Sequence, residues 1–315
     1  MSNGWDNMYV FREALQTLIT GFSTGATYGL LGVGFTLMFG VMRRLNLSYG
    51  ATLLFGGYLG ALLAIRADGA LPGIGLALVA AMVTVAGAAV SGLYVERLCF
   101  APLRDRSGVA AMVSSFAVWM QIEEVAGLLL PLHSNRYPSP FDVALLNIAG
   151  LTVRPEHVLT IAVAVSVAVA LRCLLRNSRF GLALRTLSDS PAAAEAVGIA
   201  AGRTTLMAFI LASTMGGIGA WLVLMADQQI TPMFGMWATI KGLVAMMLGG
   251  LGSIPGAVVG GLVLGLVEAS GQALFGPQVR ELMAFGLLFS VLILRPGGMF
   301  GRTAFDVGVA ADERL

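Results

Sequence analysis

Five long runs of the sequence contain no charged residue. They cover residues 14–42, 45–65, 69–95, 204–226 and 242–267. About 20 consecutive apolar residues are enough to cross the hydrocarbon core of a bilayer as a helix, and backbone in lipid must satisfy its hydrogen bonds internally. The runs therefore predict several membrane-spanning helices. The composition agrees, with 57% hydrophobic and 11% charged residues, against about 45–50% and about 25% in soluble domains.

Hydropathy predicts an all-α, polytopic membrane protein with about eight to nine transmembrane helices, including short broken helices in its core. The expected spans lie near residues 15–35, 45–65, 72–93, 109–131, 157–174, 204–226 and 281–294, and a broken segment covers 238–270. The connections hold at most about 25–30 residues, too few for a soluble catalytic domain. Residues 1–315 are therefore expected to form one membrane domain.

The distribution of arginine predicts the orientation of these spans. Arginines gather in alternate connections, which contain Arg43 and Arg44, then Arg97, Arg104 and Arg106, then Arg172, Arg176, Arg179, Arg185 and Arg203. The positive-inside rule places these connections in the cytoplasm and the N-terminus outside. Arg295 and Arg302 favour a cytoplasmic C-terminus, and that requires segment 238–270 to cross twice as two short helices.

The stretch MLGGLGSIPGAVVGGLVLGLVE, from Met247 to Glu268, contains seven glycines and a proline. Proline lacks an amide hydrogen and glycine tolerates positive φ, so a helix break is predicted near Pro255. The residues assigned to the break or to close helix packing are Gly249, Gly250, Gly252, Pro255, Gly256 and Gly260. Two interpretations stay open: tight packing alone, or broken backbone beside a transport path.

Further glycines are spaced by four at Gly21, Gly25 and Gly29, and at Gly261 and Gly265. Four-residue spacing puts small residues on one helix face, where a neighbouring helix can approach closely.

Ionisable residues within or beside the spans are few. Lys241, the only lysine, and Glu268 border one uncharged run, where they are expected to be interface anchors, with a functional role as the alternative. Glu123 and Glu124 stand inside a span and cannot share a helix face, so at least one is expected to point into the protein or a cavity.

The motifs of several enzyme classes are absent, and the chain is not expected to be an enzyme. No G-x-S-x-G nucleophile motif and no phosphate-binding G-x-x-x-x-G-K-[ST] loop occurs. His133 and His157 have no ligand spacing to each other or to a cysteine, so no metal site is expected. Any ATP must be handled by another polypeptide, and no nucleic-acid partner is expected.

The longest inner connection, residues 176–203, reads as a cytoplasmic segment with a short amphipathic helix. Ser188 or Ser190 can cap a helix that starts at Pro191 and ends at Gly198. Such a helix lies in the lipid headgroup layer or docks a soluble partner.

This connection, with Gly181, Ala183, Arg185, Asp189, Ala193 and Gly198-Ile199, resembles the coupling segment of branched-chain amino-acid ABC transporter permeases of the LivH type. ERLCFAPLR (Glu96 to Arg104), the Met247–Glu268 stretch and LRPGGMFG (Leu294 to Gly301) resemble the same family. The match covers essentially the whole chain. It implies a permease subunit of an ATP-driven importer in the bacterial inner membrane.

The resemblance also implies partners and roles. The partners are a second, LivM-type permease, two cytoplasmic ATPases that bind ATP and Mg, and a periplasmic substrate-binding protein. This chain itself would bind no cofactor, and a small solute would pass between the two permeases. Residues 188–198 would transmit force from the ATPases, and the coupling residues are Arg185, Ser188, Asp189, Ala192, Ala193, Glu195 and Gly198.

Two departures from the family pattern bear on which solute is carried. The chain has Asn46-Leu47-Ser48-Tyr49-Gly50 where the family usually reads Asn-Phe-Ala-His-Gly, and it carries two acids in the fourth span. Branched-chain amino acids are the default solute, with other amino acids, amides, urea, and aromatic or other small carboxylic acids as alternatives. The candidate pathway residues are Asn46, Ser48, Tyr49, Glu123 and Glu124. An ion-coupled secondary transporter is the alternative function, for which Glu123, Glu124 and Glu268 are the only candidate coupling acids.

Overall fold

The computed structural model describes residues 3–67, 72–104, 108–129, 135–139, 141, 146–148 and 151–301. The long helices are α1 (Asn3–Met42), α2 (Tyr49–Arg66), α3 (Gly73–Val95), α4 (Gly108–Leu129), α5 (Pro155–Asn177), α8 (Ala201–Asp227), α9 (Phe234–Gly249), α10 (Ile254–Phe275) and α11 (Arg280–Leu294). The short elements are a π-helix η1 (Glu96–Phe100), α6 (Arg179–Asp189), α7 (Pro191–Ala196), a 3-10 helix η2 (Pro277–Val279) and the strands β1 (Asn135–Arg136), β2 (Leu146–Ile148), β3 (Leu151–Val153) and β4 (Gln229–Ile230).

The expected all-α, polytopic architecture is confirmed. Eight helices of the described chain are long and apolar enough to cross a membrane, and α9 is a ninth, shorter apolar helix. The predicted spans match these helices closely, except that α1 runs from Asn3 to Met42 rather than from about residue 15 to 35. The helix continues through Arg12 and Glu13, which a search for uncharged runs cannot include.

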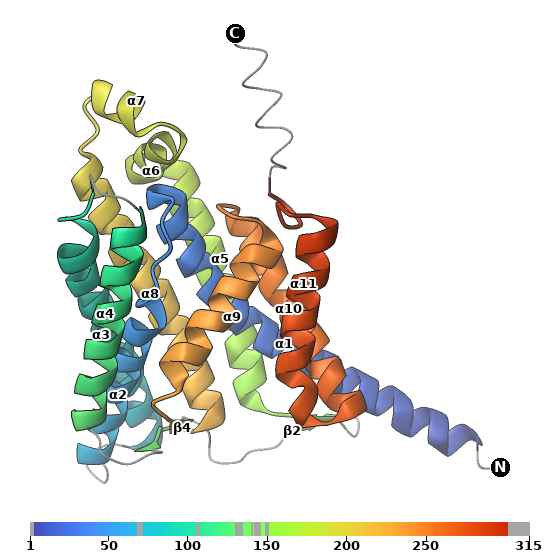
Figure 1. Cartoon of the computed structure of the whole chain (residues 1–315). Helices are drawn as coiled ribbons and strands as arrows, with labels where there is room; N and C mark the ends of the chain where they lie inside the picture. The colour runs from blue at the N-terminus through green and yellow to red at the C-terminus, as the bar shows by residue number, and fades with distance from the viewer. Residues whose placement is uncertain are drawn as a thin grey trace.

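The broken segment crosses the bundle twice, which agrees with the prediction made from the arginines near the C-terminus. α9 runs toward the end of the molecule that carries α6 and α7, the chain turns at Gly250–Ser253, and α10 returns antiparallel (Figure 1). α11 then ends on the same side as α6 and α7, whereas α1 begins at the opposite side (Figure 1). Arg295 follows α11 on that side, and Arg302 lies outside the described residues.

The turn between α9 and α10 is built from the residues predicted to break the helix. Gly250 and Gly252 have φ of 107° and 82°, a left-handed conformation that favours glycine. The Ser253 hydroxyl accepts a hydrogen bond from the Gly256 amide at 3.2 Å, and Pro255 lies in the first turn of α10. The amides of Met299 and Phe300 donate to the carbonyls of Leu248 and Gly249, both at 2.9 Å. The motif LRPGGMFG therefore caps the C-terminus of α9 with backbone hydrogen bonds.

The helices α1 and α10 pack in close backbone contact. A Cβ added to Gly25 would lie 2.8 Å from the Cα of Leu262, and one added to Gly261 or Gly265 would collide with the backbone of Gly29 or Gly25. Gly256 and Gly260 meet α9 in the same way, at Gly249 and Ala245. Packing rather than hydrophobic transfer associates helices in lipid, so these glycines hold the three helices together.

The outer helices present apolar side chains to their surroundings. Phe116 and Met120 on α4 and Leu282 and Phe289 on α11 are all exposed. An apolar exterior of this kind is unfavourable in water and normal in a bilayer. On the side of the molecule where α1 begins, β1 pairs with β4 and β2 pairs with β3, both antiparallel (Figure 1).

Candidate functional site

The arginine-rich connections meet at one end of the molecule. The Arg44 guanidinium donates to the carbonyls of Leu103 and Arg104 at 2.7 and 2.8 Å, and Arg43 donates to the Ser188 carbonyl at 3.1 Å. The first connection therefore contacts the other two, as expected if all three lie on one side of the membrane. Arg106 lies outside the described residues.

The long inner connection forms two helices rather than the single one predicted. α6 precedes α7 and is amphipathic, with Leu184 and Leu187 buried and Arg185 exposed. Hydropathy does not reveal α6, because its buried leucines alternate with arginines and the segment is not an uncharged run. Ser188 lies inside α6, where its hydroxyl donates to the Leu184 carbonyl at 2.9 Å.

The second helix has the ends predicted from the sequence. The Ser190 hydroxyl accepts the Ala193 amide at 3.3 Å, so Ser190 rather than Ser188 is the cap. Pro191 lies in the first turn of α7, and Gly198 has a φ of 80° just after its end. A left-handed glycine is a common helix stop.

The surface of this hairpin, α6 with α7, carries charged side chains, small apolar ones and two large apolar ones. The exposed coupling candidates are Arg185, Asp189, Ala192, Ala193, Glu195 and Gly198, whereas Ser188 is half-buried. Leu182 and Val197 are 60% and 71% exposed. α6 contacts α1, α5 and α8, so a displacement of the hairpin acts directly on three membrane helices.

The segment before α2 is non-helical and buried. The Asn46 carboxamide oxygen accepts hydrogen bonds from the Ser48 amide at 3.0 Å and the Ser48 hydroxyl at 2.8 Å, and the Asn46 amide group donates to the Met38 sulfur at 3.3 Å. These bonds satisfy the polar groups of a chain segment that is not helical, as a buried backbone requires.

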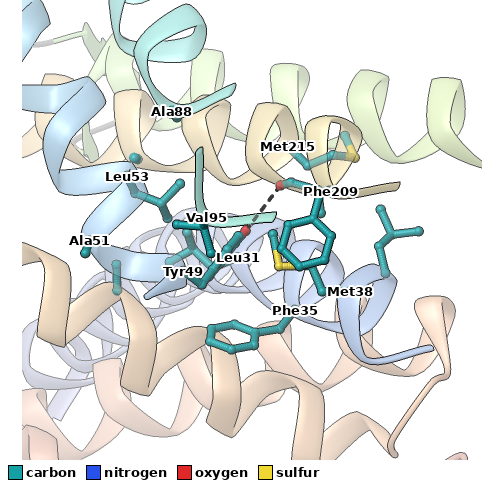
Figure 2. Close-up of a cluster of buried hydrophobic side chains, with 14 of the residues drawn as sticks. Leu31, Phe35, Met38, Tyr49, Ala51, Leu53, Ala88, Val95, Phe209 and Met215 are labelled. Atoms are coloured by element: carbon teal, nitrogen blue, oxygen red, sulfur yellow. Dashed lines mark hydrogen bonds between the residues drawn. The ribbon is translucent and has the colours of Figure 1, made fainter. Parts of the chain in front are cut away.

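Tyr49 points into the hydrophobic core (Figure 2). Its ring packs edge-on against Phe35 with centroids 4.5 Å apart, and its hydroxyl donates to the Ala212 carbonyl at 3.5 Å. Asn46, Ser48 and Tyr49 are at most 2% exposed. In this conformation they are packed against protein, and a role in the pathway stays a prediction.

The two adjacent acids of α4 lie apart from that segment. Ser115, also on α4, accepts the Leu47 amide at 3.2 Å, and Glu123 stands eight residues, or about 12 Å, further along the helix. Glu123 is half-buried and Glu124 is exposed. The structure thus does not bring the five candidate pathway residues together.

A charged cluster around the buried Lys241–Glu268 pair joins α1, α9, α10 and α11. The Lys241 ammonium contacts Glu268 Oε1 at 2.6 Å and Glu281 Oε2 at 2.9 Å. Arg280 Nε contacts Glu268 Oε2 at 2.9 Å, and the Tyr28 hydroxyl donates to the same oxygen at 2.7 Å. The four charges cancel.

The expectation that Lys241 and Glu268 are interface anchors is therefore wrong. Their exposed fractions are 0% and 1%, and each is the ion-pair partner of the other. Burying a charge is unfavourable unless it is paired and hydrogen-bonded. No local pattern indicates Tyr28 and Arg280 as their partners, although Arg280 and Glu281 form an adjacent charged pair at the start of the last span.

No group of three metal-ligating side chains occurs in the part of the chain that the structure describes. His157 Nδ1 lies 3.1 Å from the Ser23 hydroxyl, and His133 lies outside the described residues.

Comparison with known proteins identifies the family. Residues 17–292 match the family model described as branched-chain amino acid transport system / permease component. The high-affinity branched-chain amino acid transport system permease protein BraD of Pseudomonas aeruginosa is 32% identical, over 91% of this chain and 96% of that protein. The corresponding LivH protein of Escherichia coli K12 is 28% identical, over 93% and 97%.

A solved structure described as an inward-facing conformation of a metal-chelate type ABC transporter has a TM-score of 0.52 and 16% identity. The alignment covers 93% of this chain and 91% of that one, and this likeness concerns the fold. The family model covers residues from α1 into α11, and the chain therefore belongs to the branched-chain amino acid transport system permease family.

Proposed function

We propose that this chain is one of two related permeases of an ATP-driven importer in the bacterial inner membrane. A LivM-type permease would complete the pathway, two cytoplasmic ATPases would bind ATP and Mg, and a periplasmic binding protein would deliver the solute. The observation that carries the proposal is the hairpin α6–α7. It stands at the arginine-rich end, outside the membrane helices, in a chain of the permease family.

The hairpin is suited to receive force from a soluble partner. Its apolar side is fixed to the bundle through Leu184, Leu187 and Ala194, which are buried. Its outer side presents Arg185, Asp189 and Glu195 for polar contacts, together with the exposed Leu182 and Val197. Exposed apolar groups rimmed by charge are typical of protein docking surfaces. We propose that the ATPases bind this surface and move it when they close.

The proposed solute is a branched-chain amino acid, because the relatives with the widest coverage are named for that transport. The replacement of the usual family histidine by Tyr49 does not argue against it, since Tyr49 is fully buried and makes its contacts within the core.

Reconstitution with the partner subunits tests the proposal. We expect the chain to co-purify with two ATPase subunits and to support leucine uptake that requires ATP and is blocked by vanadate. Uptake by the chain alone, or uptake that stops only when an ion gradient is dissipated, would contradict it.

The ion-coupled alternative finds no favouring observation in the described residues. Of its three candidate acids, Glu268 is paired with Lys241 and Arg280, Glu124 is exposed, and Glu123 is half-buried and interacts electrostatically with Tyr58.

A further inference from the structure

A polar cavity of about 580 Å³ opens between the ends of the membrane helices farthest from α6–α7. It is lined by residues of α1, α5, α8, α9, α10 and α11. We call it the outer vestibule. Four charged side chains line it, Arg154, Asp227, Glu268 and Arg280. Two are cations and two are anions, so the lining has no net charge.

Two of these charges are placed against the local helix dipoles. Asp227 is the last residue of α8, where the carbonyl end of the helix disfavours an anion, and Arg154 directly precedes α5, where the amide end disfavours a cation. Each position costs about 0.3–1 kcal/mol at an exposed site. With the two charges exchanged, both helix dipoles would favour the charge beside them and the folded chain would be more stable.

Neither charge is compensated by a contact within the described residues. No ion pair within 4 Å and no side-chain hydrogen bond joins Asp227 or Arg154 to a described neighbour, although both carry electrostatic interactions, Asp227 with Arg280 and with Arg154 itself. Both residues are exposed and line the vestibule, so their charged groups are accessible to a ligand there.

Arg280 adds a fixed cation on the wall of the vestibule. Its Nε contacts Glu268 Oε2 at 2.9 Å and its Nη2 donates to the Tyr28 hydroxyl at 2.7 Å. These bonds orient the guanidinium and leave Nη1 without a hydrogen bond to any described residue. A guanidinium held in this way has a donor available for a carboxylate.

We propose that the outer vestibule binds the zwitterionic head of an aliphatic amino acid before it enters the membrane pathway. The carboxylate would lie between Arg154 and Arg280 near the amide end of α5, and the ammonium would lie at Asp227 near the carbonyl end of α8. Each ligand charge then offsets the unfavourable placement of the protein charge beside it. This inference rests on the proposed function, since it assigns a receiving site for the solute of that transport.

The remaining walls fit an aliphatic side chain. Val223 on α8 and Met233, Phe234 and Trp237 around the start of α9 line the same cavity. The vestibule therefore offers opposite charges and an apolar wall, which together select against dicarboxylates and amines. With no net charge on its lining, it favours a ligand with no net charge.

Ligand binding to the full chain in lipid nanodiscs tests this inference. The probe is L-leucine, titrated by saturation-transfer difference NMR, with 4-methylpentanoate and 3-methylbutylamine as analogues that each lack one charge. We expect saturable leucine binding and affinities at least about tenfold lower for both analogues. In the variants Asp227→Asn and Arg154→Gln we expect leucine affinity to fall by about tenfold or more.

Matched controls remove the same charges elsewhere on the outer half. Glu13→Gln on α1 and Arg136→Gln on β1 change exposed residues that do not line the vestibule, and leucine affinity is expected to stay unchanged. The inference is overturned if leucine shows no saturable binding, or if Asp227→Asn and Arg154→Gln bind leucine as tightly as the wild-type chain does. It is also overturned if an analogue with a single charge binds the wild-type chain as tightly as leucine. The analogue result does not depend on how well any variant folds.

Uptake separates this inference from the proposed function. If the assembled importer takes up leucine with both vestibule variants at the wild-type rate, the vestibule assignment fails and the importer assignment stands. If the wild-type assembly shows no ATP-dependent uptake while leucine still binds the chain, the proposed function fails instead.

Discussion

At the scale of single residues, the Lys241–Glu268 ion pair lies buried between the membrane helices. Lys241 and Glu268 border an uncharged run, and residues at such positions commonly reach the membrane interface. In the structure they are buried, and they contact the buried Tyr28 and the half-buried Arg280. Pairing across four helices depends on tertiary packing, which no local pattern reports. The shared location of Asp227 and Arg154 in one cavity could not be predicted either, because in the sequence each is an ordinary charge at the end of a span.

Replacing Lys241 by methionine tests the energetic role of the charged cluster. The variant leaves two carboxylates opposite one guanidinium, and an uncompensated buried charge costs about 3–5 kcal/mol. We expect a loss of that order in the free energy of unfolding, measured by denaturation in detergent micelles. Glu281 is 53% exposed, so Glu281→Gln alone is expected to cost little. The double variant restores charge balance and should be more stable than Lys241→Met. If it is not, charge balance is not the stabilising factor.

Ser48 provides a test of the candidate pathway. Its side chain is fully buried, so a cysteine at this position is expected to be protected from a soluble thiol reagent in the conformation described here. If the segment before α2 lines the path in another state, the reaction rate should rise during ATP turnover by the assembled importer. Protection in every state would show that Ser48 is a packing residue.

At the scale of elements, small residues decide which helices touch. Gly25 and Gly29 of α1 meet Gly265 and Gly261 of α10, and Gly249 of α9 meets Gly256 of α10. The four-residue spacing indicated a packing face, but it did not say which helix would occupy it. That choice depends on where the α9–α10 turn directs α10.

A single methyl group tests this contact. In Gly265→Ala, the new Cβ would overlap the backbone of Gly25, and we expect a loss of about 1–3 kcal/mol in unfolding free energy, measured as above. Gly286→Ala on α11 is the matched control, since a Cβ there meets nothing within 4 Å. Equal stability of the two variants would mean that α1 and α10 are not held at this distance.

At the scale of the whole molecule, α9 and α10 set the topology. Because they cross separately, the α11 end and the hairpin α6–α7 lie on one side, and the start of α1 lies on the other (Figure 1). The hairpin and the outer vestibule thus occupy opposite ends of the bundle. An importer needs this separation, because its motor and its solute act on different sides of the membrane.

Two changes in the hairpin test how force is transmitted. Ala193 is exposed on α7, and Ala193→Asp would place a charge in the proposed ATPase contact. Gly198→Val would strain a residue with a φ of 80°. In both variants we expect ATP hydrolysis by the assembled importer to continue while leucine uptake falls at least about tenfold, with membrane insertion intact. Normal uptake in both would remove the coupling role of residues 188–198.

The sequence by itself indicated the membrane class, the spans and the family, because hydropathy and glycine spacing are patterns within single segments of the chain. The orientation stays a prediction from the placement of arginine. The sequence also located the α9–α10 turn and the cap and stop of α7, where proline, serine and glycine act within a few residues. The tertiary structure decided that α6 forms a second inner helix, that Lys241 pairs with Glu268, and that Arg154, Asp227 and Arg280 share one cavity. Those arrangements join residues from distant helices, and only the packing of the folded bundle brings them together.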